Sequence, residues 1–320
     1  MNLTVPEPRA AREPIVPPGH VNHHAADMTA TAAADVSLDG VQARLALEGQ
    51  WLPVDGDGEA SLAELVLANS TGPLRLGGGA WRDLLLGCQF TDGRNRLISA
   101  GGRTVKNVAG YDLTKLILGS FGAFGTPVTF TFRTYRRPTA SVIAVFPPVQ
   151  ASVNDLLPTD LRPSWMALSD DGLACGYHGD DRTARYFRES LRRLDGPKPK
   201  SVTPVSIERD IVIRHDLWRG DFRLSLPPAR VAEAMRSLSP APARWVADPV
   251  HGIVVGDAHP DDPDGPERVA RQFGGTALAF DPAGRPKRLS FDPVTAKLVR
   301  DLKARLDPDH ALPPLPIHLT

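Results

Sequence analysis

Hydrophobic positions near the start of the chain follow first a strand period and then a helix period. Small and β-branched residues at 28–34 predict a strand. Behind a capping Ser37, apolar residues recur at helical spacing, the last of them Leu47, which predicts an amphipathic helix that ends at Gly49. Residues 61–69 predict a second short helix, again begun by a serine.

The next part of the chain alternates strand patterns with turn residues. Residues 83–91 and 97–100 predict two strands joined by a turn at Asp92-Gly93. Asp112 is placed to cap a helix that runs to Leu118, and residues 128–135 alternate like a third strand. Glycines crowd between these elements, so the segment combines a regular scaffold with close turns.

Beyond Pro138 the pattern changes to alternating short strands and helices. Residues 223–226 predict a strand, and residues 228–238 predict the helix that follows it. Residues 280–291 are expected to be rich in loops, and residues 293–306 to form a final amphipathic helix before an extended proline-rich tail. The predicted class is α+β, with a flexible proline-rich lead and two domains (1–19, 20–138 and 139–320).

Composition narrows the classes of function. The chain has 320 residues with 37 basic and 37 acidic side chains, and this balance excludes a dedicated nucleic-acid binder, which needs a basic surface. Cys88 and Cys175 lack a CxxC partner and are expected to be buried free thiols of a reduced compartment. There is neither a 20-residue apolar run nor a basic start followed by an apolar segment, so a cytoplasmic protein without a membrane span is expected.

Scattered histidines offer alternative chemistry. His23, His24 and Asp27 have a spacing that suits a metal, but flexible exposed histidines at a domain entry are far more common than ligands, so no metal site is predicted. The other histidines show no nucleophile-plus-base arrangement, and core or surface roles are expected for them: His178, His215, His251 and His259.

The densest signal is the glycine-rich stretch at 101–125. Glycines allow backbone amides to approach a large planar cofactor or its phosphates without a Cβ in the way. A helix begun at Asp112 would also place free N–H groups near such a site. Residue types and spacing therefore favour a cofactor site here.

The run GGRTVKNVAGYDLTKLILGSFGAFG, followed by a strand and Arg-Arg-Pro, closely resembles the FAD-binding subunit of glycolate oxidase. That subunit belongs to the wider flavin fold of vanillyl-alcohol oxidase and p-cresol methylhydroxylase. The resemblance covers residue 20 to the C-terminus and is strongest between 60 and 138. It implies a p-cresol methylhydroxylase-type FAD-binding domain at 20–138, followed by a small α+β cap domain that ends in a helix.

The resemblance also implies which residues line FAD. The cofactor loop is expected at 60–72, and the glycine-rich segment supplies the rest. Lys106 is expected either as a cation near the phosphates or as a solvated side chain, and Asp112 as a helix cap rather than a catalytic base. The full implied set is Ser61, Asn69, Gly72, Asp83, Gly102, Lys106, Asn107, Gly110, Tyr111, Asp112, Gly119, Gly122 and Gly125.

The sequence departs from the family pattern in two places. No strand–glycine loop–strand unit precedes Met28, so the first FAD subdomain is expected to be missing. Ala63-Glu64 replaces a glycine pair that would let the backbone touch the pyrophosphate, and two like charges ~4 Å apart repel by about 4 kcal/mol at an effective dielectric of 20. Pro127 removes a further amide donor. Weakened FAD binding is predicted.

Three functional hypotheses stay open. The first is an FAD-binding oxidoreductase subunit that takes part in 2-hydroxy acid (glycolate) oxidation, beside a larger FAD-linked subunit and an iron–sulfur subunit. The chain has no cysteine cluster of its own, so an iron–sulfur centre would come from that partner. The second is a non-catalytic structural subunit that has lost FAD, and the third is a mis-assigned start with the missing subdomain encoded upstream.

Overall fold

The computed structural model describes residues 14–102, 113–148, 161–194, 198–281 and 284–316. The chain divides into two compact units, and each is described here by itself. The first unit comprises residues 1–70, 79–137 and 297–315. The second unit comprises residues 71–78, 138–296 and 316–320.

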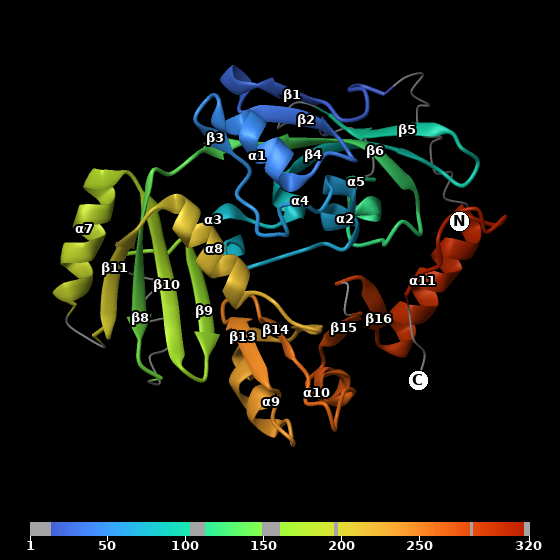
Figure 1. The fold of residues 1–320 in the computed structure, drawn as a ribbon. Helices are drawn as coiled ribbons and strands as arrows, with labels where there is room; N and C mark the ends of the chain where they lie inside the picture. The colour runs from blue at the N-terminus through green and yellow to red at the C-terminus, as the bar shows by residue number, and fades with distance from the viewer. Residues whose placement is uncertain (1–13, 103–112, 149–160, 195–197, 282–283, 317–320) are drawn as a thin grey trace, which may run out of the picture. The chain divides into compact units, whose positions relative to one another are not determined.

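A five-stranded antiparallel sheet forms the first unit (Figure 1). Its strands lie in the order β1 (Val21–His24), β2 (Thr29–Ala33), β6 (Thr126–Arg133), β4 (Leu85–Thr91) and β5 (Leu97–Gly101). A separate two-stranded ribbon pairs β3 (Gln50–Trp51) with β7 (Tyr135–Arg136). The predicted strands at 28–34, 97–100 and 128–135 are therefore present, with shifted ends at β6.

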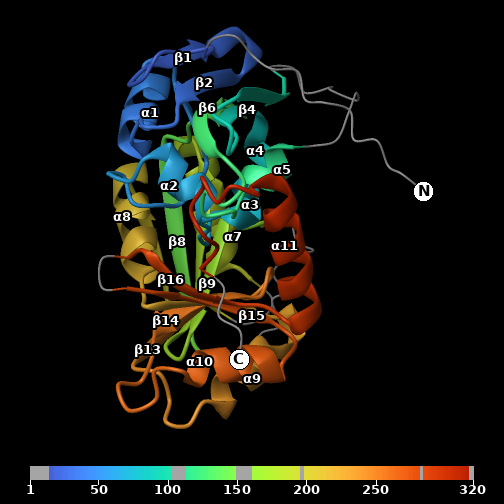
Figure 2. The same ribbon diagram turned by 90° about the vertical axis from the view of Figure 1, so that its right-hand side faces the viewer.

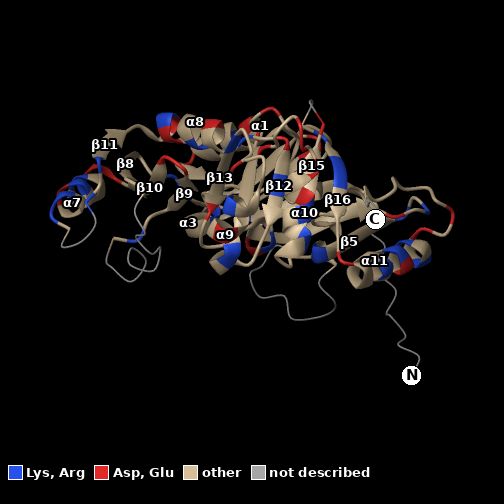
Figure 3. Cartoon of the chain, turned by 90° about the horizontal axis from the view of Figure 1, so that it is seen from below, with Lys and Arg blue, Asp and Glu red and all other residues tan. Residues whose placement is uncertain are grey.

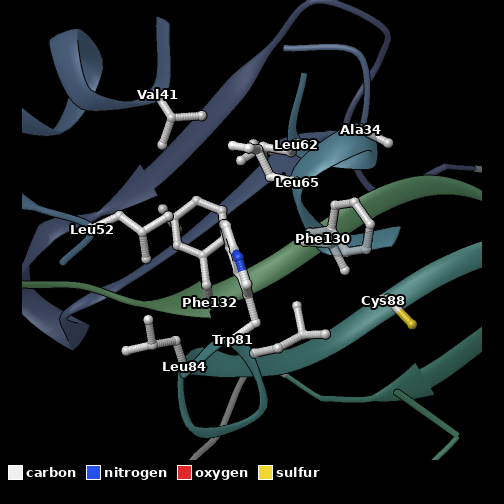
Figure 4. Close-up of a cluster of buried hydrophobic side chains, with 14 of the residues drawn as sticks. Ala34, Val41, Leu52, Leu62, Leu65, Trp81, Leu84, Cys88, Phe130 and Phe132 are labelled. Carbon is white, nitrogen blue, oxygen red and sulfur yellow. The ribbon is translucent and has the colours of Figure 1, made fainter. Parts of the chain in front are cut away.

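Short helices pack on this sheet and close its core. They are η1 (Ala25–Asp27), α1 (Leu38–Ala46), α2 (Leu62–Leu67), α4 (Trp81–Leu84) and α5 (Thr114–Ile117). Trp81, Phe130 and Phe132 are almost fully buried and pack with aliphatic side chains from α1 and α2 (Figure 4). Burying one such aromatic side chain removes about 150–250 Å² from water, so these residues dominate the stability of the unit.

The helix begun at Ser37 is confirmed, but it ends at Ala46, one residue before the last apolar position of the predicted pattern. The Ser37 side chain accepts a hydrogen bond from the Gly40 amide, and Leu38 and Leu45 are buried. Leu47 lies outside α1 and is 75% exposed, so its prediction as a core position is wrong. Gly49 adopts a φ of 64°, which a glycine permits at the end of a helix.

Two other boundaries differ from the prediction. Asp83 was placed in a strand, but it lies in the helical turn α4, and β4 begins only at Leu85. The helix predicted to run from Asp112 to Leu118 is α5, which ends at Ile117. Asp112 itself lies outside the described residues.

A nine-stranded antiparallel sheet forms the second unit. The strand order is β11 (Ser201–Val205), β8 (Ala140–Phe146), β10 (Gly172–Gly179), β9 (Trp165–Ser169), β13 (Arg244–Asp248), β14 (Ile253–Asp257), β12 (Phe222–Ser225), β15 (Thr276–Phe280) and β16 (Pro286–Ser290). Residues 280–291 were expected to be rich in loops, and β16 corrects this prediction. Pro286 is compatible with a strand because β16 lies at the edge of the sheet.

Helices cover this second sheet. α7 (Asp181–Arg192) packs on β8, β10 and β11, and α10 (Gly265–Gln272) packs on β12 and β15. α8 (Ile207–Leu217) contacts β8, α9 (Val231–Ser237) follows the short helix η2 (Pro228–Arg230), and α3 (Arg75–Gly78) contacts β9. The predicted helix at 293–306 is α11 (Pro293–Leu306), whose residues pass from the second unit into the first (Figure 2).

Both cysteines are buried free thiols, as predicted. Burial raises the pKa of Cys175 to about 12, because a thiolate would lose its hydration there. Within the described residues, none of the helices combines the length and apolar character that a membrane crossing requires.

Candidate functional site

The start of α2 is closed by the chain's own side chains. Ser61 is the N-cap, and its hydroxyl accepts a hydrogen bond from the Glu64 amide at 3.2 Å. The Glu64 carboxylate reaches back and accepts from the Ser61 amide at 2.7 Å and from the Ser61 hydroxyl at 2.8 Å. This reciprocal arrangement is a capping box, and it satisfies amides that a helix start otherwise offers to an anion.

Glu64 therefore stands where the sequence comparison expected a bare glycine. Its side chain is exposed, so water screens its charge, and two unit charges about 4 Å apart repel by only ~1 kcal/mol in bulk water. The exposure lowers the repulsion estimated from sequence. The larger obstacle to a diphosphate at α2 is that the Ser61 amide already has an acceptor.

A second stretch of the predicted site is the glycine loop, residues 119–125. The amides of Gly119 and Phe121 donate to the carbonyls of Val66 and Leu67 at the end of α2. Gly119 and Gly122 have φ values of 71° and 81°, in the left-handed region that glycine tolerates. The loop therefore caps the C-terminal end of α2, as a C-capping turn does.

The remaining amide contacts of this loop are also internal. The Gly122 amide donates to the Ser120 hydroxyl, the Ala123 amide to the Ser120 carbonyl, and the Gly125 amide to the Gly122 carbonyl. These donors are engaged within the protein, so the loop does not present them to a phosphate.

Several predicted glycines have a packing reason instead. A Cβ on Gly125 would lie 2.5 Å from a ring carbon of Phe90, and one on Gly119 would lie 3.3 Å from the Cβ of Asn69. Gly101 has a φ of 72° and passes against the backbone of Leu86 in β4. Gly102 extends this contact, because its amide donates to the Leu86 carbonyl at 3.1 Å.

The other predicted site residues do not lie together in the fold. Asp83 caps α4, with its carboxylate accepting from the Ala80 amide at 2.9 Å. Asn69, with a φ of 46°, lies beside Gly119 at the opposite end of α2 from Ser61. Gly72 belongs to the second unit. Five predicted residues lie outside the described residues: Lys106, Asn107, Gly110, Tyr111 and Asp112.

The end of α11 is tied to the glycine loop by a lysine. Lys303 Nζ donates to the Ala123 carbonyl at 2.9 Å, to the Leu312 carbonyl at 3.2 Å and to Asp307 Oδ2 at 2.5 Å. The hydrogen bond from Lys303 lowers the pKa of Asp307 from its ordinary value, against an opposing effect of burial. The loop is therefore held by α2 on one side and by α11 with its tail on the other.

The second unit holds a buried charged group that the sequence analysis missed. Asp210 on α8 is fully buried and accepts from four side chains, which together with it form the Asp210 cluster: Ser141 (2.7 Å), Trp165 (2.9 Å), His178 (3.1 Å) and Arg214 (2.8 Å). Three of the donors come from β8, β9 and β10, so the cluster fastens α8 to three adjacent strands. Burial lowers the pKa of Arg214, because its guanidinium loses hydration.

A second concentration of charge involves two arginines of the same unit. Burial, and to a lesser extent the charge of Arg75 on α3, lowers the pKa of Arg223, on β12, to about 10. The only sequence signal for this pair was the position of Arg223 inside a strand pattern.

Two of the histidines make side-chain contacts within the protein. His23 lies in β1 and its Nε2 is 3.0 Å from Gln50 Oε1, so the expectation that it is flexible and exposed is wrong. His251 Nδ1 lies 2.7 Å from Asp248 Oδ2. Among the described residues, no group of three or more His, Cys, Asp or Glu side chains is placed to hold a metal ion.

Comparison with known proteins decides the ancestry. Glycolate oxidase subunit GlcE of Escherichia coli (strain K12) is 30% identical over 308 residues, which are 91% of this chain and 82% of that protein. The chain belongs to the GlcE family. Glycolate oxidase subunit GlcD of Bacillus subtilis (strain 168) is 27% identical over 152 residues, which are 45% of this chain and 32% of that protein.

The fold agrees with this membership. A solved structure of alkyldihydroxyacetonephosphate synthase superposes with a TM-score of 0.59 at 12% identity, over 89% of this chain and 64% of that one. The α+β class and the p-cresol methylhydroxylase-type FAD-binding fold predicted from the sequence are therefore confirmed. No family model matches the chain.

Within the described residues, the two stretches do not fit the diphosphate of FAD. The start of α2 is filled by Ser61 and Glu64, and the amides of residues 119–123 and of Gly125 donate to groups of the protein itself. Both stretches provide a frame in which α2 is capped at each end.

The Asp210–Arg214 pair of the second unit has i,i+4 spacing on α8, and this spacing was the one sequence signal that could have revealed it.

Proposed function

We propose that this chain is the FAD-binding-type subunit of an oxidoreductase complex that oxidises a 2-hydroxy acid such as glycolate. The observation that carries the proposal is the similarity to glycolate oxidase subunit GlcE, which extends over 91% of this chain and 82% of that protein. The similarity includes both units, and the fold match supports a p-cresol methylhydroxylase-type flavin fold.

In this proposal FAD is contacted mainly through the motif residues at 101–112, of which Lys106, Asn107, Gly110, Tyr111 and Asp112 stay predictions from the sequence. A bound flavin supplies two-electron redox chemistry. The first unit contributes the frame that fixes the ends of this motif at β5 and α5. α2 contributes no amide to the diphosphate, and weak FAD binding is expected.

The second unit is proposed as the cap domain that receives the substrate. Arg223, on β12 of this unit, is proposed to bind the carboxylate of a 2-hydroxy acid, because a guanidinium donates the parallel hydrogen bonds that a carboxylate accepts. Replacing Arg223→Gln in the complex should raise KM for the 2-hydroxy acid about tenfold, a loss of about 1.4 kcal/mol. Arg230→Gln, an exposed arginine of the same unit, is the control and should leave KM unchanged.

The experiment that tests the function is co-expression of this chain with a larger FAD-linked subunit and an iron–sulfur subunit from the same genome. Oxidation of glycolate and D-lactate is followed with an artificial electron acceptor, in preparations with and without this chain. Activity that requires this chain supports the proposal. Full activity without it, or no 2-hydroxy acid oxidation in either preparation, contradicts the proposal.

A second candidate function is a structural subunit of the same complex that binds no FAD. The specific observation in its favour is the capping box at α2, which places Glu64 and Ser61 where a diphosphate would need bare amides. The two candidates differ in one outcome. A structural subunit stabilises the complex but takes up no flavin when it is purified by itself.

A further inference from the structure

The outward face of α11 carries a row of exposed leucines. Leu298, Leu302 and Leu306 are spaced by four residues and are 64%, 39% and 43% exposed. Residues four apart lie above one another on a helix, so the three side chains form one narrow ridge about 12 Å long, called here the leucine stripe. Isolated exposed leucines are common, but an aligned row on one helix is typical of a contact surface.

The internal contacts of α11 lie to one side of this stripe. Ala296 is buried, and Lys303, seven residues later, bonds to the Ala123 and Leu312 carbonyls and to Asp307. Residues seven apart share a helix face, and at 100° per residue this face lies about 100–120° around the helix from Leu302. The exposure is therefore a property of the packed helix and does not require it to fray.

The charges around the stripe indicate what binds it. α11 contains four basic residues and one acidic residue, and the acidic one, Asp301, already pairs with Lys297 at 2.7 Å. Figure 3 shows basic residues and fewer acidic ones on this helix, and Lys303 pairs with Asp307 just beyond its end. The hydrogen bond from Lys297 and its charge, with smaller contributions from Arg305 and Arg300, lower the pKa of Asp301.

A second copy of the same chain fits this surface poorly, because two basic helices would repel each other. A membrane surface also fits poorly, because helices that lie in a lipid interface present a broad apolar face with aromatic anchors. The leucine stripe presents one leucine in each helical turn, which matches the narrow apolar seam between two paired helices.

We propose that the leucine stripe of α11 is the docking site for an acidic amphipathic helix of another subunit in the complex. The proposal rests on the proposed function for the existence of that complex, and it adds the surface, the partner's secondary structure and its charge. Since Lys303 joins α11 to Ala123, the docked helix would lie on an element that is hydrogen-bonded to the glycine loop.

The test uses the full chain and the co-expressed pair of other subunits, the larger FAD-linked one and the iron–sulfur one. Leu298→Ser and Leu302→Ser should each weaken binding to that pair about tenfold, and the double variant about 100-fold. Arg305→Glu should weaken it several-fold and reduce its dependence on salt. Leu47→Ser, on an isolated leucine of the first unit that is 75% exposed, is the matched control and should bind like the parent.

Titration by fluorescence anisotropy gives the affinities, and circular dichroism with thermal unfolding checks that each variant folds. Loss of binding in the double variant with normal binding by Leu47→Ser supports the proposal. Equal affinity of the double variant and the parent overturns it, and so does the absence of any complex.

Two further results would also overturn the proposal in favour of other occupants. One is a dimer of the chain alone that the double variant loses, measured by light scattering. The other is binding to vesicles of phosphatidylglycerol and phosphatidylcholine that the double variant loses while the complex still forms. Failure of the proposed function is a separate outcome, in which a stripe-dependent complex forms but oxidises no 2-hydroxy acid.

Discussion

The two units of this protein keep their polar chemistry in different places. In the first unit the polar residues of the predicted site are helix caps and turn formers at the surface, such as Ser61 with Glu64, and Asp83. In the second unit a charged group is buried: the carboxylate of Asp210, on α8, accepts hydrogen bonds from four side chains. The polar residues of the predicted site in the first unit therefore make local contacts, whereas the buried charges of the second unit join residues far apart in sequence.

The largest effect should come from breaking the Asp210 cluster. Asp210→Ala leaves the buried Arg214 without its carboxylate partner, and removing one member of a buried ion pair costs about 3–5 kcal/mol of unfolding free energy. Urea unfolding measures this loss. Glu233→Ala, which breaks the exposed Arg230–Glu233 pair, should cost less than about 1 kcal/mol. Similar losses in both variants would show that the cluster is not a stabilising centre.

The first unit should instead be most sensitive at Gly101, the glycine that ends β5. Gly101→Ala combines a left-handed backbone, which costs about 1–2 kcal/mol, with a collision against Leu86 that costs about 1–3 kcal/mol. Gly49→Ala is the matched control, because its φ of 64° is similar and nothing lies within 4 Å of the added Cβ. A difference in unfolding free energy of less than 0.5 kcal/mol between the two would contradict the close β4–β5 approach.

The capping box gives a smaller effect, on ligand affinity. Replacing Ala63→Gly together with Glu64→Gly frees the Ser61 amide and removes one negative charge. FAD affinity should then rise about fivefold, which corresponds to about 1 kcal/mol. Glu59→Gly, an exposed glutamate outside α2, is the control. An affinity that is unchanged by the double replacement would show that the diphosphate does not use the start of α2.

The smallest effect is a pH dependence at the end of α11. The hydrogen bond from Lys303 keeps the pKa of Asp307 below its value of about 4 in the unfolded chain. Its contribution to stability is therefore fully present above pH 4 and is lost as pH falls through the folded pKa. Lys303→Met should reduce the loss of stability between pH 5 and pH 3, which is measured as the difference between the urea midpoints at the two pH values. Lys297→Met, at an exposed pair, should change it less.

Much of the first unit could be predicted from the sequence because its signals are local. Ser37 and Ser61 cap helices where the pattern placed them, and the alternation at 128–135 marks β6. Leu47 misled the prediction because periodicity continues past the helix end, whereas burial stops with the helix. Asp83 misled it because an apolar run follows a one-turn helix that has little periodicity.

The second unit and the candidate site were harder to predict for a physical reason. The Asp210 cluster joins residues up to 69 positions apart, so a contact of this kind leaves no local pattern. The role of the glycines was also ambiguous, since a glycine that approaches a phosphate and one that approaches Phe90 look alike in sequence. Only the hydrogen bonds of residues 119–125 show that these amides serve the protein itself.

We propose that this chain keeps a weak FAD site, formed mainly by the motif residues at 101–112. The most direct measurement is a visible absorption titration of the purified chain, by itself, with FAD. A weak site should give shifted flavin bands that saturate at about one FAD per chain, with tighter binding in the Ala63→Gly, Glu64→Gly variant. Flavin bands identical to those of free FAD, in both proteins at every concentration, would contradict it and leave the structural subunit.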